Sequence, residues 1–182
     1  MPSREPYHGL SRKLVLAFDV GTTFSGVSYC ILDPGEVPKI LGVSRYPAQE
    51  HVGGDHKIPS ILYYDRQGVR KKAGINSSGK FRVEPPLYRS FAYRDAIRWK
   101  LHLRAKHLAS SHIKDDDIPP LPQGKNAVQV LGDFMRYLFD CARTYIIESH
   151  ASGASMWRSM ENNIKFILTH PNATATADSP RC

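Results

Sequence analysis

The sequence predicts an α/β fold in which a mixed sheet begins with three antiparallel strands. Three short apolar segments follow one another early in the chain and are separated only by turn residues, which is the pattern of a strand meander. A long amphipathic segment, residues 126–149, then precedes one more apolar segment, residues 163–169. This succession of strand, long helix and strand indicates that the last strand returns to the first sheet.

The three strands of the meander are predicted from their composition and their boundaries. Residues 14–18 form a continuous apolar run that ends at Asp19 and Gly21. Residues 26–32 alternate apolar and small side chains and stop at a proline-glycine turn, and residues 39–43 follow as the third strand. Because the connections are too short for a helical crossover, neighbouring strands must run antiparallel.

The middle of the chain, residues 45–123, is richer in glycine, proline and charge, and we interpret it as an inserted α+β subdomain. A strand is predicted over residues 60–64. Residues 87–108 contain no proline or glycine and are assigned to a helix. Residues 115–122 are assigned to a linker, because consecutive prolines prevent a helix and donate no ladder hydrogen bonds.

Residues 126–149 are expected to form a helix with one buried face, because apolar side chains recur at steps of three and four. The side chains assigned to that face are Val128, Leu131, Met135, Leu138, Phe139, Ala142, Tyr145 and Ile146. The two ends of the chain, residues 1–13 and 173–182, are polar and carry no apolar face, so both are predicted to be disordered.

The composition argues against several classes of protein. No segment approaches the roughly 20 apolar residues of a membrane span or the apolar core of a signal peptide, so we expect a soluble, cytoplasmic protein. The three cysteines form no CxxC pair, which indicates reduced thiols rather than disulfides or a zinc site. The formal charge of +8 attracts anions, but the basic residues are dispersed, which argues against a nucleic-acid interface.

The sharpest local signal is Asp19-Val20-Gly21-Thr22-Thr23-Phe24-Ser25-Gly26, between the first two strands. A turn there can present successive backbone N–H groups to phosphate oxygens without a lysine. Gly21 allows close approach, Thr22 and Thr23 add hydroxyl donors, and the strand-end carboxylate is placed to hold a water of hydrated magnesium. The pattern predicts a nucleotide-phosphate site; the alternative is an ordinary hairpin in which these residues only satisfy turn geometry.

Several segments of the sequence resemble a known family. Residues 16–32 are similar to the first phosphate motif of the 70-kDa heat-shock chaperones and their actin-like relatives, and residues 57–64 resemble the strand that enters the family's second lobe subdomain. Residues 129–150, followed by residues 166–172 ending in Thr-His-Pro-Asn, resemble the divergent, chaperone-like branch. The resemblance implies that residues 14–172 form the first lobe of a ribonuclease-H-like, actin-like ATPase domain whose second lobe is incomplete.

The resemblance also implies roles for single residues. The loop around the β- and γ-phosphates of ATP or ADP would consist of Gly21, Thr22, Thr23 and Phe24. Asp19 would face the Mg²⁺ ion, and Lys100 falls where the family keeps a lysine that positions the attacking water, so both are catalytic candidates. For Lys100 a surface lysine is the alternative. Pro171 resembles a proline that relays the nucleotide state, and a simple strand stop explains it equally well.

The family's second glycine-rich phosphate loop and its adenosine motif do not occur in this sequence. We therefore expect an ATP-binding, chaperone-like fragment with negligible hydrolysis of its own, and the change of composition after Asn172 suggests a truncated gene product. Unfolded proteins and co-chaperones are implied as partners only through regions that this chain lacks. Two alternatives stay open: a carbohydrate kinase, since those enzymes begin with a similar hairpin, and a remnant or interaction module that binds no nucleotide.

Overall fold

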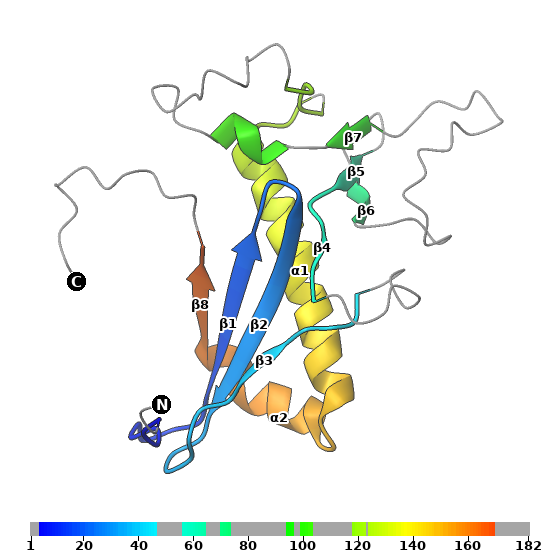
Figure 1. The fold of residues 1–182 in the computed structure, drawn as a ribbon. Coiled ribbons are helices and arrows are strands. Elements are labelled where there is room, and N and C mark those ends of the chain that lie inside the picture. Colours follow the sequence, from blue (N-terminus) through cyan, green and yellow to red (C-terminus); the bar gives the residue numbers. More distant parts are fainter. Residues whose placement is uncertain are drawn as a thin grey trace, which may run out of the picture.

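The computed structural model describes residues 4–46, 56–64, 70–73, 94–96, 99–103, 118–122 and 124–169. These residues form a mixed sheet of five strands, a second sheet of three strands and two α-helices (Figure 1). The predicted α/β class and the mixed sheet are confirmed. The expected tail, residues 173–182, and Pro171 lie outside the described residues.

The larger sheet is built around β1 (Lys13–Val20). β1 pairs antiparallel with β2 (Phe24–Leu32) over its whole length and parallel with β8 (Ile164–Leu168) on its other side. β3 (Ile40–Gly42) and the short β4 (Ile58–Pro59) both pair antiparallel with β2. The predicted meander and the return of the last strand to it are therefore both present.

The turn after β2 fixes the N-terminal segment. Gly35 adopts φ 84°, a left-handed conformation that glycine tolerates without steric cost. Tyr7 exchanges two backbone hydrogen bonds with this turn, donating to Glu36 O at 2.8 Å and accepting from Gly35 N at 2.9 Å. Residues 4–12 contain no helix or strand but are held against the end of β2 by these bonds.

Helix α1 (Ala127–Ser149) begins at a capping box and matches the predicted helix closely. Asn126 Oδ1 accepts from Gln129 N, and Gln129 Oε1 accepts from Asn126 N, each at 2.9 Å. The buried stripe consists of Val130, Phe134, Leu138, Cys141, Ala142 and Ile146. Val128, which the periodicity assigned to that stripe, is 67% exposed, because a residue two positions before Val130 faces the opposite side of the helix.

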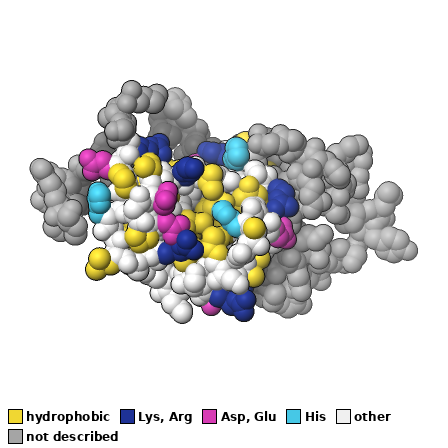
Figure 2. Space-filling model, turned by 90° about the horizontal axis from the view of Figure 1, so that it is seen from below, with side chains coloured by type: hydrophobic (Ala, Val, Ile, Leu, Met, Phe, Trp, Pro, Cys, Tyr) yellow, Lys and Arg dark blue, Asp and Glu magenta, His cyan; other side chains and the backbone are white. Residues whose placement is uncertain are grey.

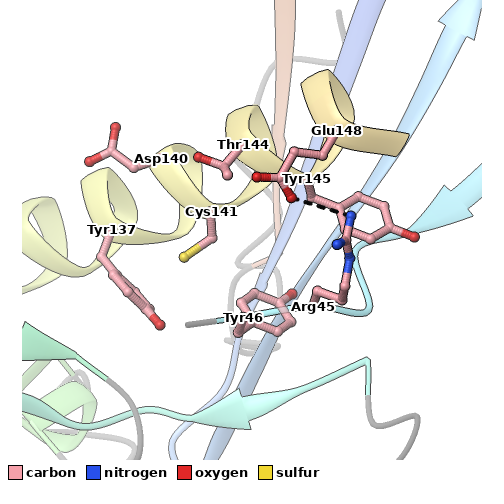
Figure 3. A pocket seen from close by; sticks show the side chains of 8 residues that line it. All are labelled: Arg45, Tyr46, Tyr137, Asp140, Cys141, Thr144, Tyr145 and Glu148. Atoms are coloured by element: carbon pink, nitrogen blue, oxygen red, sulfur yellow. Dashed lines mark ion pairs between the residues drawn. The ribbon is translucent and has the colours of Figure 1, made fainter. Parts of the chain in front are cut away.

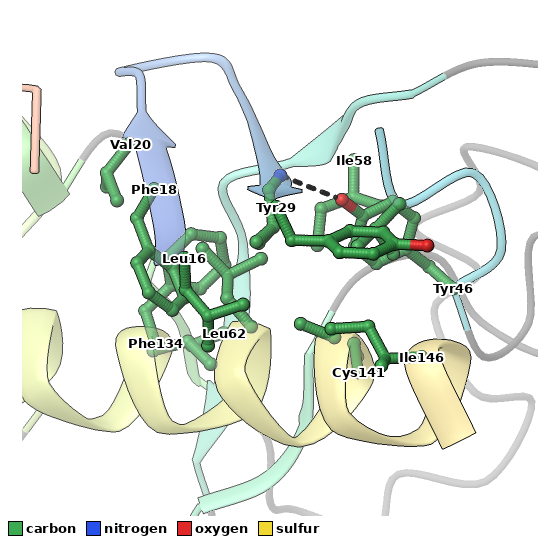
Figure 4. Packing of buried hydrophobic residues seen from close by; sticks show 14 of the residues in the cluster. Leu16, Phe18, Val20, Tyr29, Tyr46, Ile58, Leu62, Phe134, Cys141 and Ile146 are labelled. Carbon is green, nitrogen blue, oxygen red and sulfur yellow. Dashed lines mark hydrogen bonds between the residues drawn. The ribbon is translucent and has the colours of Figure 1, made fainter. Parts of the chain in front are cut away.

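The main core lies between α1 and the larger sheet (Figure 4). The strand β1 alternates, so that Leu14, Leu16, Phe18 and Val20 are buried toward the helix and the residues between them are half-buried. Each fully buried Leu or Phe contributes roughly 1.5–3 kcal/mol through the hydrophobic effect. The second helix, α2 (Gly153–Met160), adds a buried tryptophan and methionine to this core.

The smaller sheet joins β5 (Leu62–Tyr64) antiparallel to β6 (Arg70–Ala73) and to β7 (Arg94–Ala96). It belongs to the segment interpreted as an inserted subdomain, much of which lies outside the described residues. Of the strand predicted over residues 60–64, residues 62–64 form β5, and Ser60 and Ile61 separate it from β4. The Tyr64 hydroxyl donates to Asp133 Oδ2 at 3.0 Å, which connects this sheet to α1.

The helix predicted over residues 87–108 is wrong in its described part. That part contains β7 and the 3₁₀ helix η1 (Trp99–Leu103) instead. The absence of proline and glycine favoured a helix locally, but pairing of β7 with β5 and burial of Trp99 against Phe134, 5.6 Å between ring centroids, override that preference.

The described cysteines are buried, and the surface in view mixes charged and apolar side chains (Figure 2). Cys30 and Cys141 are buried, and burial raises the pKa of the Cys30 thiol. Within the described ranges, neither helix has the length and hydrophobicity to span a bilayer. Figure 2 shows the end of the molecule where α2 and the N-terminal segment lie, and on this face basic side chains are interspersed with acidic and apolar ones.

Candidate functional site

The β1–β2 turn, residues 21–24, is held closed by its own first amide. Gly21 N donates to Phe24 O and to Ser25 Oγ, both at 3.1 Å. A Cβ atom on Gly21 would lie 2.2 Å from Phe24 O, so a side chain at this position would force the turn to open. In the described part of the chain, the amides of Thr22 and Thr23 donate to no backbone carbonyl. Gly21 therefore shapes the turn.

Ser60 clamps this turn from a neighbouring segment. Its Oγ donates to Gly21 O at 2.8 Å and lies 2.7 Å from Ser25 Oγ. Its backbone N–H donates to Thr23 O at 2.9 Å. Ser25 and Ser60 are buried, at 0% and 1% exposed, so these bonds are shielded from water. The turn consequently has a fixed shape before any ligand arrives.

Asp19 lies at the end of β1 with its carboxylate half exposed. Lys57 Nζ donates to Oδ2 at 2.8 Å, and Thr169 Oγ1 donates to Oδ1 at 3.0 Å. The pKa of Asp19 is lowered, first by the Lys57 hydrogen bond and further by Thr169 and by the charges of Lys57 and Lys100, against a smaller opposing effect of burial. Asp19 is therefore a carboxylate at neutral pH, oriented by two donors.

Lys100 reaches the same place from η1. Its Nζ donates to Val20 O, the carbonyl next to Asp19 in the chain, although 80 residues separate Lys100 from Val20. Burial lowers the pKa of Lys100, and the nearby charge of Asp19 opposes that shift. The ammonium group is thus only partly solvated and lies beside the end of β1.

Trp99 fixes η1 to the turn. Its Nε1 donates to Ser60 O at 3.1 Å, and its ring is 1% exposed. Ser60 therefore contacts the turn through its hydroxyl group, and its carbonyl oxygen accepts a hydrogen bond from Trp99, which lies in the same 3₁₀ helix as Lys100. One serine thus sets the relative positions of the turn and the lysine.

The structure brings most of the sequence-predicted residues together. Asp19, Gly21, Thr22, Thr23 and Lys100 lie on or beside the turn. Phe24 contributes its carbonyl oxygen to the turn, and its side chain is 50% exposed. Sequence reasoning did not assign site roles to Ser25, Lys57, Ser60, Trp99 and Thr169. A weak signal existed for Ser60, which is a serine between apolar residues in the segment 58–62.

The chemistry of these groups suits a phosphate ligand. Two ammonium groups and one carboxylate leave a net positive charge beside the amides and hydroxyls of Thr22 and Thr23. Among the described residues, no group of three or more His, Cys, Asp or Glu could hold a metal ion. A single carboxylate fits a magnesium ion that keeps several waters and takes its remaining ligands from phosphates.

A separate cavity of about 350 Å³ lies between α1 and the segment after β3 (Figure 3). It is lined by Arg45, Tyr46, Tyr137, Asp140, Cys141, Thr144, Tyr145 and Glu148. Arg45 already contacts Glu148 at 3.3 Å and lies 5.3 Å from the centre of the Tyr145 ring. Its cation is therefore matched within the protein, and none of the sequence-predicted site residues reaches this cavity.

Comparison with protein-family models, curated proteins and solved structures returns no match. The fold and the contacts themselves define a mixed α/β protein with a preformed polar turn at one end of its central hairpin, flanked by a carboxylate and two lysines.

Proposed function

We propose that this chain binds the phosphates of an adenine nucleotide, together with magnesium, at the β1–β2 turn, as the first lobe of an actin-like ATPase of the heat-shock-chaperone type. One observation carries the proposal. Asp19 and Lys100, which lie in distant parts of the sequence, flank the same turn, with Lys100 bound to the carbonyl beside Asp19. An ordinary hairpin does not require this arrangement.

Each residue has a distinct role in the proposal. The amides and hydroxyls of Thr22 and Thr23 bind phosphate oxygens at a turn already closed by Gly21. Asp19, kept ionised and oriented by its donors, holds the magnesium ion through water. The ion, when bound, neutralises phosphate charge. Lys100 provides a positive charge at the base of the turn and is the candidate for orienting a water.

The expected affinity is low. A hydrogen bond to a charged group contributes about 1.5–3 kcal/mol, so two such amide bonds correspond to a dissociation constant of roughly 0.05–10 mM. The sequence contains no second glycine-rich loop that would add further donors. We therefore propose that the chain binds the nucleotide without turning it over.

Titration followed by NMR tests the proposal, because it detects binding in this range. The amide signals of Thr22 and Thr23 are expected to shift on addition of MgATP up to about 10 mM, with MgCl₂ alone as the reference. Asp19→Asn should weaken binding by about tenfold or more. Asp33→Asn is the matched control, since Asp33 also lies at a strand end in an ion pair, with Arg12, but at the opposite end of the hairpin.

Two results would contradict the proposal. One is the absence of any shift at the turn with 10 mM MgATP. The other is an Asp19→Asn variant that binds MgATP as well as the Asp33→Asn variant does.

A further inference from the structure

We propose that Lys57 is a phosphate-binding residue of this site, held on Asp19 while the site is free and transferred to the nucleotide when magnesium takes its place. This inference rests on the proposed function. It concerns a residue to which the sequence analysis gave no role in the site.

The backbone of Lys57 is fixed beside the turn, whereas its side chain is not. Lys57 directly precedes β4, whose Ile58 is fully buried and pairs with Ser25 of β2. The Lys57 side chain is 56% exposed and Asp19's is 50% exposed. Exposed ion pairs add little to stability, and a lysine stem rotates freely, so the ammonium can leave Asp19 at small cost.

The two lysines of the site differ in this respect. Lys100 Nζ is bound to a backbone carbonyl and is partly buried, so its position is set by the fold. Lys57 Nζ is bound at 2.8 Å to the carboxylate that is the candidate for holding the hydrated magnesium ion. Of these two ammonium groups, a magnesium ion held at Asp19 must therefore displace only that of Lys57.

Charge balance decides where the displaced ammonium goes. Magnesium at Asp19 repels Lys57, while the triphosphate brings a surplus of negative charge to the same turn. Movement of Lys57 from carboxylate to phosphate keeps its ammonium beside a negative group both before and after binding. In the free chain the same contact keeps Asp19 ionised and oriented, which prepares the carboxylate for the metal.

The test compares Lys57→Gln, Lys57→Arg and the control Lys39→Gln, in which an exposed lysine just before β3 is neutralised. The readouts are the dissociation constant for MgATP from the Thr22 and Thr23 signals and the thermal midpoint without ligand. We expect Lys57→Gln to weaken binding at least tenfold while lowering the midpoint only slightly, since an exposed ion pair adds little to stability. Lys57→Arg should stay within threefold of the unmodified chain, and Lys39→Gln should match it.

A second measurement needs no variant. In the unmodified chain, the Lys57 side-chain NMR signal should shift with MgATP more than with MgCl₂ alone. If the unmodified chain binds MgATP and Lys57→Gln binds equally well or more tightly, Lys57 has no phosphate role and the proposed function stands. If the unmodified chain shows no binding, both proposals fail.

Discussion

The hydroxyl oxygens of Ser25 and Ser60 lie 2.7 Å apart in a buried environment, although 35 residues separate them. Through this pair the β1–β2 turn is joined to the segment between β4 and β5. Ser60 also receives the Trp99 indole N–H, which brings in η1. The shape of the turn is thus determined by three segments that are distant in sequence.

Replacing Ser60 by Ala should destabilise the protein by about 1–3 kcal/mol, because Gly21 O and Ser25 Oγ lose a buried partner. Urea denaturation measures this change. Ser152→Ala is the control, since Ser152 is exposed at the start of α2 and makes no side-chain cap bond, and it should change stability by less than about 0.5 kcal/mol. Equal effects of the two substitutions would contradict the stabilising role of the Ser60 hydroxyl at the turn.

Two glycine substitutions should act in opposite directions. Gly21→Ala places a Cβ atom 2.2 Å from Phe24 O and should destabilise the protein by about 1–3 kcal/mol through strain in the turn. Gly132→Ala, in α1, meets no atom within 4 Å and should stabilise it by about 0.5–1 kcal/mol through helix propensity. Thermal unfolding of both variants checks the signs, and a stabilising Gly21→Ala would refute the close-contact argument.

Sequence patterns predicted the elements whose signal is local. The apolar run of β1, the capped periodic helix α1 and the strand β8 were all placed within a few residues. The failures have tertiary causes: β7 forms because β5 offers it a partner, and Val128 is exposed because the buried stripe runs through Val130.

Some residues of the candidate site could likewise be predicted from a local pattern, and others could not. Asp19 and the turn residues stand together in the sequence and could be selected as a motif. Lys57, Ser60 and Thr169 act through contacts across 38, 39 and 150 residues, which no local pattern encodes.

Acid should weaken the folded state through Asp19. Its pKa in the folded chain is below the ordinary 3.8, so the stabilisation is present above that value and is lost as the pH falls through the folded pKa. The stability difference between the unmodified chain and Asp19→Asn should therefore shrink as the pH is lowered from about 5 to 2. Denaturation at several pH values measures it, and a difference independent of pH would contradict the assignment.

The titration of the Asp19 carboxylate reports directly on its contact with Lys57. Lys57→Gln removes the largest cause of the lowered pKa, so the carboxyl signal of Asp19 should titrate at higher pH in that variant. Carbon-detected NMR of the carboxyl group follows this change. In Lys39→Gln the titration should stay where it is in the unmodified chain.

Replacing Trp99 by Phe should cost about 1–3 kcal/mol beyond the loss of ring area, because Ser60 O loses its indole donor. Trp157→Phe is the control for ring size, since Trp157 is also buried and packs against an aromatic ring, Phe139, at 5.7 Å. Only Trp99→Phe should shift the side-chain NMR signal of Lys100. An unchanged Lys100 signal would show that η1 is positioned by other contacts.

The pairing of β1 with β8 has a consequence for synthesis on the ribosome. The hairpin of β1 and β2 is translated early, but the strand that covers the other side of β1 follows only after more than a hundred further residues. At roughly 5–20 residues per second, translation of this stretch takes on the order of ten seconds. During this time one edge of β1 exposes its backbone donors and acceptors to other nascent chains. Expression yield should therefore respond to translation speed between these two strands.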